Sequence, residues 1–264
     1  MWKLEQLLDV LSTPRDKLTT IKPVGSNHKL VTFSKNVFIP VTNACRNKCA
    51  YCGFRSSTPR IMSRGEVAGI LESGREHGCK EALFTFGEQP ESVKEIRDEL
   101  RSWGYSSSTE YLLGLCEDAI RYGLLPHSNI GVSTAEDLRA LKDVNASMGL
   151  MLESASERLC GKGMPHEFSP GKRPDVRLKF IGEAGKLGIP FTTGLLIGIG
   201  ETNVEIVESL MALRKIQDRY GHLQEVIIQN FTPRPGTTME HVKGPSTATM
   251  LRVVCASKMA LPGV

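Results

Sequence analysis

The sequence predicts an α/β fold of the (β/α) TIM-type barrel class, and three observations support this. Apolar runs of strand length alternate with amphipathic helical stretches along the chain. Several of the apolar runs are continuous, as in parallel strands that are buried on both faces. Six strand-then-helix units follow one another, which implies a parallel sheet with right-handed crossovers. A closed barrel of about eight units would need two more, so we expect its C-terminal closure to be missing.

Each expected element has its own justification in the sequence. The predicted strands are the apolar runs 36–42, 81–86, 124–130, 146–152, 191–197 and 225–231. The predicted helices are 63–77, 90–102, 109–122, 134–142, 174–187, 203–220 and 246–259. Ser63, Thr134 and Thr202 each stand three residues before a carboxylate, which is the pattern of a capping box. Gly78 and Gly188 follow helical runs at the position where a helix ends.

A single core domain preceded by a helical lead-in is expected from these elements. Residues 1–33 should form an N-terminal helical lead-in, because leucines at 4, 7, 8 and 11 fall at helical spacing. Residues 34–264 should form the single core barrel. Its strand-end loops should build the site, because in parallel barrels the loops at the carboxyl ends of the strands meet on one face.

Composition narrows the classes of function. The net charge of +4 comes without a basic block, which argues against nucleic acid as a partner. No apolar run reaches the roughly 18 residues of a membrane span, so no membrane partner is expected. Four of the cysteines stand singly, at 79, 116, 160 and 255, and we expect them to be ordinary reduced thiols. This pattern and a charged N-terminus unlike a signal peptide predict a cytoplasmic protein.

The stretch CRNKCAYC, at 45–52, carries the strongest chemical signal. It places Cys45, Cys49 and Cys52 in one loop directly after the first predicted strand. Soft thiolates bind zinc or iron–sulfur clusters. A structural zinc site uses four ligands, and the chain offers no fourth cysteine nearby. Three ligands on a four-iron cluster leave one iron open to bind and reduce a substrate. The sequence therefore favours a cluster, with zinc and unrelated thiols as alternatives.

The spacing C-x-x-x-C-x-x-C, with Tyr51 just before the last cysteine, resembles the radical S-adenosylmethionine (SAM) superfamily. The resemblance implies a 4Fe–4S cluster on the three cysteines and SAM as a consumed co-substrate bound beside it, in contact with Tyr51. It also implies that an electron from the cluster cleaves SAM. The resulting 5′-deoxyadenosyl radical abstracts hydrogen from a small-molecule substrate.

The same resemblance assigns roles to residues in later loops. Gly87, Glu88 and Gln89, in GEQP, resemble the segment that holds the methionine amino group; the alternative is a plain strand-to-helix turn. Glu153 is expected to bind the ribose hydroxyls, and Arg177 the methionine carboxylate. An exposed carboxylate and a surface arginine are the respective alternatives.

The adenine side is assigned to the ends of the fifth and sixth strands. Gly198, Gly200 and Glu201, in GLLIGIGE, and Asn230, in QNFTPRPGT, resemble cofactor-binding positions. A glycine-rich or proline-rich turn is the alternative for each. His127 and His166 lie at predicted strand tops, so either is a weaker candidate to touch substrate or to act as an acid or base.

Several longer stretches, including LFTFGEQPE, GMPHEFSPGK and IIQNFTPRPGT, resemble the CofG-type 7,8-didemethyl-8-hydroxy-5-deazariboflavin synthase family between residues 34 and 237. This resemblance implies a carbon–nitrogen lyase in the biosynthesis of the deazaflavin coenzyme F(420). Its substrate would be 5-amino-5-(4-hydroxybenzyl)-6-(D-ribitylimino)-dihydrouracil, an adduct derived from tyrosine, and the ring would close with loss of ammonia. A CofH-type radical SAM subunit is the implied partner, and a reducing electron donor is also needed.

One departure and several alternatives accompany this expectation. Members of the family run several tens of residues further, through a segment that completes the barrel, and we expect this chain to lack that part. The alternatives are the CofH-type partner itself, a radical SAM enzyme of menaquinone or hydrogenase-cofactor assembly, and a truncated metal-binding protein without catalytic activity.

Overall fold

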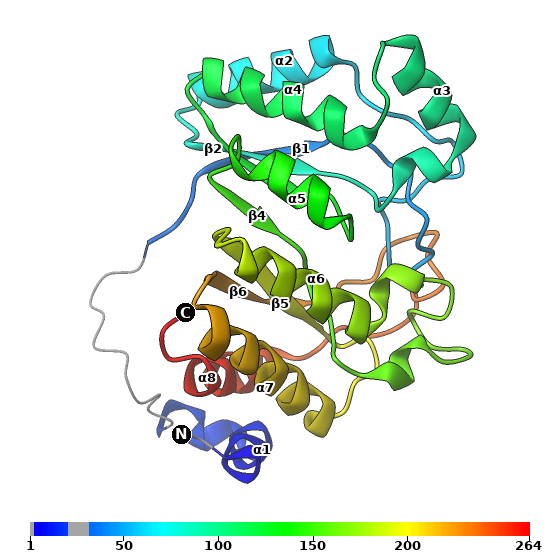
Figure 1. The fold of residues 1–264 in the computed structure, drawn as a ribbon. Helices are drawn as coiled ribbons and strands as arrows, with labels where there is room; N and C mark the ends of the chain where they lie inside the picture. The colour runs from blue at the N-terminus through cyan, green and yellow to red at the C-terminus, as the bar shows by residue number, and fades with distance from the viewer. Residues whose placement is uncertain (1–2, 21–31) are drawn as a thin grey trace.

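One curved, all-parallel sheet of six strands forms the centre of the molecule (Figure 1). The computed structural model describes residues 3–20 and 32–264. The strands are β1 Asn36–Pro40, β2 Glu81–Thr85, β3 Leu125–Asn129, β4 Ser147–Gly149, β5 Phe191–Ile197 and β6 Leu223–Asn230. They pair in chain order from β1 to β6, each parallel to the next. Within the described residues β1 and β6 stay unpaired to each other, so the sheet is open as expected.

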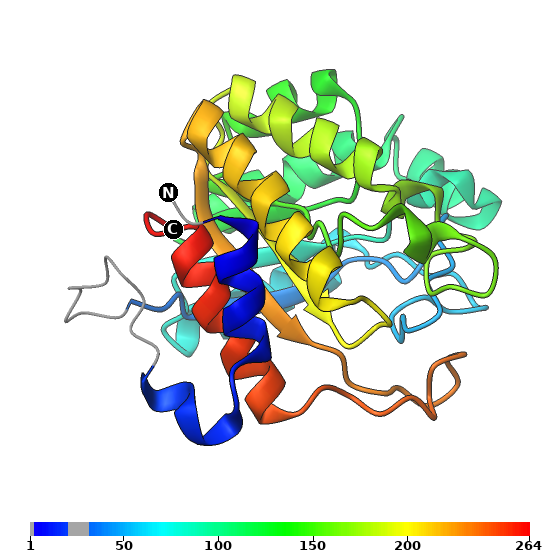
Figure 2. The same ribbon diagram turned by 90° about the horizontal axis from the view of Figure 1, so that it is seen from below.

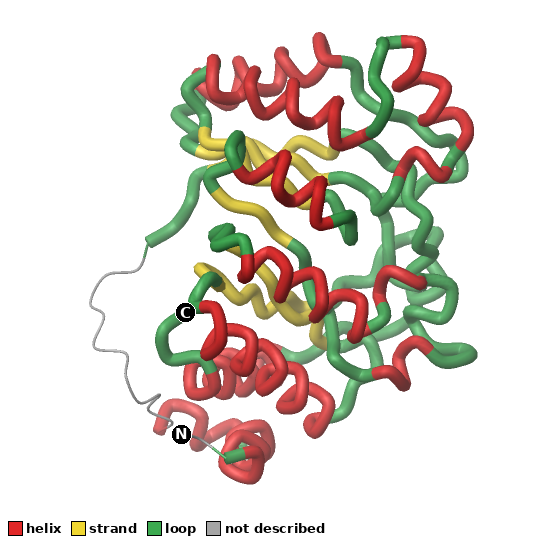
Figure 3. The backbone as a smooth tube through the Cα atoms, in the orientation of Figure 1, coloured by secondary structure: helices red, strands yellow, loops and turns green. Residues whose placement is uncertain are grey.

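Most of the helices lie along one face of this sheet (Figure 3). They are α2 Arg64–Glu76, α3 Lys94–Ser102, α4 Ser108–Arg121, α5 Ala135–Lys142, α6 Pro174–Lys186, α7 Asn203–Tyr220 and α8 Thr247–Ala260. From α4 to α8, each helix packs on the next one along the chain, and α2, α4, α6 and α8 also pack on β1, β3, β5 and β6. This arrangement is an arc of a barrel and not a doubly wound sheet, which confirms the predicted fold class.

The helix starts follow the predicted caps. The side chains of Ser63, Thr134 and Thr202 each accept a hydrogen bond from the backbone N–H three residues on, and that residue's carboxylate bonds back to the cap. Each reciprocal pair satisfies two backbone donors that a helix start leaves free. The local sequence thus fixes where α2, α5 and α7 begin.

Two elements differ from the prediction near the site. The strand expected over 146–152 is regular only over Ser147–Gly149, and a few residues later Glu153 adopts a left-handed backbone with φ of 65°. The helix expected over 90–102 is interrupted. A 3-10 turn, Pro90–Ser92, is followed by an extended Val93 with φ of −86° and ψ of 124°, and only then by α3. Both departures change the course of the chain at a strand end.

The N-terminal helix α1, Leu4–Ser12, lies against α7 and α8 (Figure 2). Its Leu7, Val10 and Leu11 are buried in the main hydrophobic core. The helix expected in the lead-in is therefore present, although residues 1–2 and 21–31 of that lead-in lie outside the described residues. The boundary between lead-in and barrel stays a prediction. None of the helices in the described part of the chain is long and apolar enough to cross a membrane.

Candidate active site

A cavity of about 520 Å³ opens at the carboxyl ends of the strands. Its walls come from loops that are far apart in sequence, because parallel strands deliver their carboxyl ends to one edge. Nine of the predicted site residues line it: Cys45, Cys49, Tyr51, Cys52, Gly87, Glu88, Glu153, Arg177 and Asn230. The structure therefore brings these residues together, while the role of each stays a prediction.

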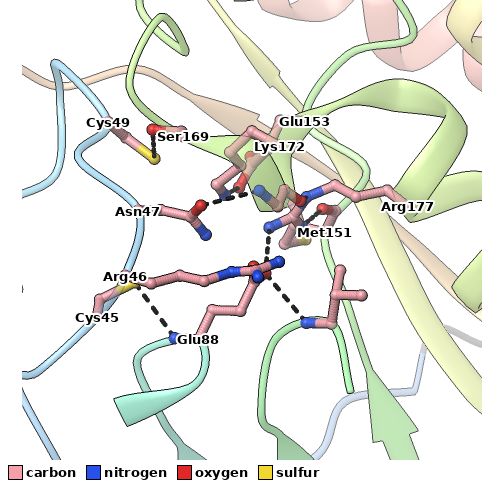
Figure 4. Close-up of polar contacts among 12 residues, drawn as sticks. Cys45, Arg46, Asn47, Cys49, Glu88, Met151, Glu153, Ser169, Lys172 and Arg177 are labelled. Carbon is pink, nitrogen blue, oxygen red and sulfur yellow. Dashed lines mark hydrogen bonds and ion pairs between the residues drawn. The ribbon is translucent and has the colours of Figure 1, made fainter. Parts of the chain in front are cut away.

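The three cysteines of the 45–52 loop are half-buried free thiols at this cavity. Figure 4 shows two of them, Cys45 and Cys49. The Glu88 backbone N–H donates to Cys45 Sγ over 3.2 Å, and Ser169 Oγ donates to Cys49 Sγ over 3.3 Å. Burial raises the pKa of the Cys45 thiol, against the effect of the N–H groups of Asn47 and Glu88. Hydrogen-bond donors aimed at sulfur favour the thiolate, so this donor set fits a cysteine-ligated iron–sulfur cluster.

The ligand assignment itself is not tested by the geometry. Among the described residues, no group of three or more His, Cys, Asp or Glu side chains is recognised as able to hold a metal ion. Cluster ligation by Cys45, Cys49 and Cys52 therefore stays a prediction.

The end of β2 is pressed against the cysteine loop at Gly87. A Cβ added to Gly87 would lie 1.8 Å from the Ala44 carbonyl oxygen and 2.8 Å from Cys45 Cβ. Next to it, the Arg46 backbone N–H donates to the Glu88 carbonyl oxygen over 3.0 Å. Only a glycine fits this close backbone approach, which places the loop directly over the strand end.

Glu88 is a buried carboxylate with both oxygens in use. Oε1 accepts from Arg46 Nε over 2.8 Å, and Oε2 accepts from the Val132 backbone N–H over 3.1 Å. Arg177 Nη2 lies 3.8 Å from the same Oε2. Cations on two sides compensate the cost of burying this charge.

Arg177 is also buried, and its guanidinium is already engaged. Its Nε donates to the Gly171 carbonyl over 2.8 Å, and its Nη1 donates to the Met151 carbonyl. The predicted alternative of a surface arginine is therefore wrong. Arg177 ties the start of α6 to the β4 strand end beside the cavity.

Glu153 and Lys172 form a second buried ion pair on the cavity wall. Lys172 Nζ donates to Glu153 Oε1 over 2.5 Å, and the two side chains are 13% and 10% exposed. Burial alone would raise the pKa of the Glu153 carboxyl, but Lys172 and Arg177 lower it overall. The predicted alternative of an exposed loop carboxylate is wrong, because Glu153 is buried and ionised.

Backbone strain is concentrated at these strand ends. Among the described non-glycine residues, only Gln89 and Glu153 have positive φ, at 45° and 65°. Such conformations cost roughly 1–3 kcal/mol and persist where the surroundings enforce them. Glu153 is held by its N–H, which donates to the Gly194 carbonyl, and by its own carbonyl, which accepts from Leu196 N–H, both over 3.0 Å.

Gln89, His127 and His166 are among the predicted residues that do not line this cavity. Gln89 accepts a hydrogen bond from Arg46 and lines a separate cavity of about 330 Å³. His127, on β3, is buried with Nδ1 2.7 Å from Ser147 Oγ, and burial lowers its pKa to about 4. His166 Nε2 lies 3.0 Å from the Tyr51 hydroxyl, and burial followed by the nearby Lys172 lowers its pKa to about 4. Both histidines are neutral at pH 7.

The glycines predicted to lie on the adenine side form a local turn. Gly198 and Gly200 have φ of 99° and 108°. The Glu201 carboxylate accepts from the N–H groups of Gly198 and Ile199 over 2.6 and 2.9 Å. These residues do not line the 520 Å³ cavity. Their contact with a cofactor stays a prediction.

Four polar side chains that organise the site were not predicted from the sequence: Arg46, Asn47, Ser169 and Lys172. Asn47 Oδ1 accepts from the Gly171 N–H over 2.9 Å, which joins the cysteine loop to the segment before α6. Asn47 lies inside the cysteine motif, and Lys172 lies in the long loop after the fourth predicted strand. Their position in strand-end loops was the signal that could have marked these residues as part of the site. Their bonding partners are distant in sequence, so no local pattern shows the contacts.

The chain is similar to known proteins along most of its length. A family model described as the radical SAM superfamily matches residues 39–213. A 7,8-didemethyl-8-hydroxy-5-deazariboflavin synthase from Methanocaldococcus jannaschii is 50% identical over 96% of this chain and 71% of its own length. The synthase of the same name from Methanothermobacter thermautotrophicus is 53% identical over 89% of this chain and 72% of its own length.

Solved structures show the same fold at low sequence identity. Methylornithine synthase, PylB, superposes with a TM-score of 0.77 at 17% identity and covers 98% of this chain and 73% of its own. The FeFe-hydrogenase maturase HydG from Carboxydothermus hydrogenoformans gives a TM-score of 0.78 at 18% identity, over 99% of this chain and 60% of its own. At this identity the likeness concerns the fold alone.

Proposed function

The chain belongs to the radical SAM superfamily and, within it, to the 7,8-didemethyl-8-hydroxy-5-deazariboflavin synthase family, and from this premise we propose its reaction. The substrate is the tyrosine-derived hydroxybenzyl–ribityliminouracil adduct, and the product is the 8-hydroxy-5-deazaflavin used for coenzyme F(420). The enzyme acts as a carbon–nitrogen lyase: it removes hydrogen from the adduct, ammonia leaves and the ring closes.

A 4Fe–4S cluster on Cys45, Cys49 and Cys52 would supply the electron that cleaves SAM, giving methionine and the 5′-deoxyadenosyl radical that abstracts hydrogen. The chain's own residues bind and orient this co-substrate. One observation carries the proposal: the three thiols share a cavity with two buried carboxylates, Glu88 and Glu153, and their cationic partners.

The charges at the cavity suit a ligand that carries both signs. SAM has an amino group, a carboxylate and a sulfonium. We assign the amino group to the Gly87–Glu88 strand end and the carboxylate to the cationic side at Arg177, with Lys172 as a second cation on the same wall. Glu153 is assigned to the ribose hydroxyls, because an ionised carboxylate accepts hydrogen bonds from hydroxyl groups. Asn230, on β6, is assigned to the adenine side of the cavity.

The test is an anaerobic reaction of iron-reconstituted protein with the synthetic adduct, SAM and a strong one-electron reductant. We expect about four irons per chain, deazaflavin fluorescence and an equivalent yield of 5′-deoxyadenosine. Cys49→Ala should lose the cluster and both products, and Cys255→Ala, outside the cysteine loop, should lose none of them.

Different failures refute different parts of the proposal. Protein that binds iron and cleaves SAM but forms no deazaflavin would refute the proposed substrate. The proposed radical chemistry would still stand. Protein that binds zinc without iron would refute the cluster itself. A Cys49→Ala variant with an intact cluster would refute the ligand assignment.

The cellular setting is part of the proposal. A CofH-type radical SAM enzyme would supply the adduct, and a low-potential one-electron carrier would reduce the cluster. We place the protein in the cytoplasm, because none of its seven cysteines is in a disulfide and unpaired cysteines persist in reducing compartments.

A further inference from the structure

The Ser169 hydroxyl, in the segment before α6, forms two hydrogen bonds with the cysteine loop (Figure 4). Its oxygen accepts a hydrogen bond from the Lys48 backbone N–H over 3.1 Å. The same hydroxyl donates to Cys49 Sγ over 3.3 Å. Because the oxygen accepts from a fixed backbone group, its own hydrogen is directed to the sulfur.

The surroundings hold these two hydrogen bonds in place. Ser169 is 1% exposed, so water does not compete for its hydroxyl. Residues 165–171 are bound to the cysteine loop by three further hydrogen bonds: Lys48 N–H to Phe168 O over 3.1 Å, Ala50 N–H to Pro165 O over 2.9 Å, and Gly171 N–H to Asn47 Oδ1 over 2.9 Å. The distance between Ser169 and Cys49 is therefore fixed by several independent contacts.

A donor aimed at a ligating sulfur changes the energy of adding an electron. Reduction of an iron–sulfur cluster increases the negative charge on its sulfurs, and hydrogen bonds to those sulfurs raise the reduction potential. The effect on the potential is largest where water is excluded and the hydrogen bond is well aligned. Of the three cysteines, Cys45 receives a backbone donor that no side-chain substitution can remove, whereas Cys49 receives the Ser169 hydroxyl.

We propose that Ser169 is a positioning residue that raises the reduction potential of the cluster by donating its hydroxyl hydrogen to Cys49 Sγ. This inference rests on the proposed cluster and goes beyond it, because it names the side chain that sets how easily the cluster accepts one electron. Ser169 touches neither substrate nor SAM in this role.

The test compares two substitutions of equal shape, Ser169→Thr and Ser169→Val, in the iron-reconstituted full chain. Ser169 has φ of −130° and ψ of 75°, so its φ is negative, as is usual for residues other than glycine. Threonine keeps the hydroxyl and valine removes it. In both variants the Lys48 N–H retains the Phe168 carbonyl as acceptor, so no backbone donor is orphaned. The midpoint potential is measured by titration with redox mediators, following the spin signal of the reduced cluster.

We expect Ser169→Val to have a more negative midpoint potential than Ser169→Thr, with Thr close to the parent protein and iron content equal in all three. Ser169→Ala, which adds no volume, should shift in the same direction as Val. Ser128→Ala is the matched control: this buried serine lies 3.6 Å from the sulfur of Cys116, outside the cysteine loop, and its loss should leave the potential unchanged.

Equal potentials in the Thr and Val variants would overturn the inference, as would an equal shift in Ser128→Ala. Loss of iron in Ser169→Val but not in Ser169→Thr would also overturn it, because the hydroxyl would then be needed for assembly. A parent protein without a reducible four-iron cluster would instead refute the proposed function.

Discussion

At the scale of single residues, the site depends on charges that are buried in pairs. Glu153 and Lys172 are both mostly shielded from water. Desolvation makes such a pair costly to form, but removing one partner costs more because the other charge is left uncompensated.

Lys172→Met should therefore lower the free energy of unfolding by about 3 kcal/mol, since it leaves the buried Glu153 carboxylate without its lysine partner. Arg177 limits the loss, because it also stabilises that carboxylate. The double variant Glu153→Gln/Lys172→Met should be more stable than Lys172→Met alone. Urea unfolding of the metal-free proteins measures both, and strictly additive losses would contradict the pairing.

His127 should make stability depend on pH in the acid range. Its folded pKa of about 4 lies below the ordinary value of 6.5. As pH falls below 6.5 the unfolded chain gains a proton that the folded chain does not, so stability is lost between pH 6.5 and 4. The maximum loss from this group is about 3 kcal/mol.

His127→Asn, which can keep a hydrogen bond to Ser147, should show a shallower loss over the same range. Urea unfolding of both proteins at several pH values tests this. His166 contributes equally to both profiles, so the difference between them isolates His127. Parallel profiles would show that His127 does not titrate in this way.

At the scale of elements, the chain at the end of β2 approaches the cysteine loop too closely for a side chain at Gly87. Gly87→Ala places a Cβ on the Ala44 carbonyl and should displace the loop. We expect a several-fold lower iron content after reconstitution, with helix content by circular dichroism unchanged.

Gly69→Ala is the matched control for this variant. Gly69 lies on the exposed side of α2 with no atom within 4 Å of an added Cβ. It should keep full iron content and gain about 0.5–1 kcal/mol of stability. Equal iron content in Gly87→Ala and Gly69→Ala would mean that the loop tolerates the displacement.

The sequence predicted the elements better than the contacts of the site. Strand order and helix starts follow from local patterns, as the capping boxes at Ser63 and Thr202 show. The shortened β4 did not follow, because the left-handed turn at Glu153 is imposed by hydrogen bonds to β5. Ser169 and Lys172 were missed because their roles depend on partners 120 and 19 residues away, and no local spacing encodes such contacts.

At the scale of the whole molecule, α1 completes the core beside α7 and α8. Leu7 is fully buried there, whereas Leu4 on the same helix is 41% exposed. Arg252 Nε on α8 also donates to the Thr13 carbonyl over 2.7 Å, which ties the end of α1 to α8. The N-terminal helix is therefore part of the cooperative fold.

Leu7→Ala should cost about 2–5 kcal/mol, because it removes buried methyl groups and leaves a cavity. Leu4→Ala should stay within about 0.5 kcal/mol of the parent protein. Thermal or urea unfolding of the pair measures the difference. Equal stabilities would show that α1 packs loosely and unfolds separately.

The hydrogen bonds that hold the cysteine loop have a thermodynamic consequence for metal loading. Arg46, Lys48 and Ala50 each donate a backbone hydrogen bond to a carbonyl outside the loop. The loop has thus already lost, on folding, the conformational entropy that a disordered loop would lose when it binds metal. Uptake of iron for the proposed cluster would then be an association with a preorganised receptor. Its affinity would be separate from the folding equilibrium, unlike that of metal domains that are unfolded without their ion.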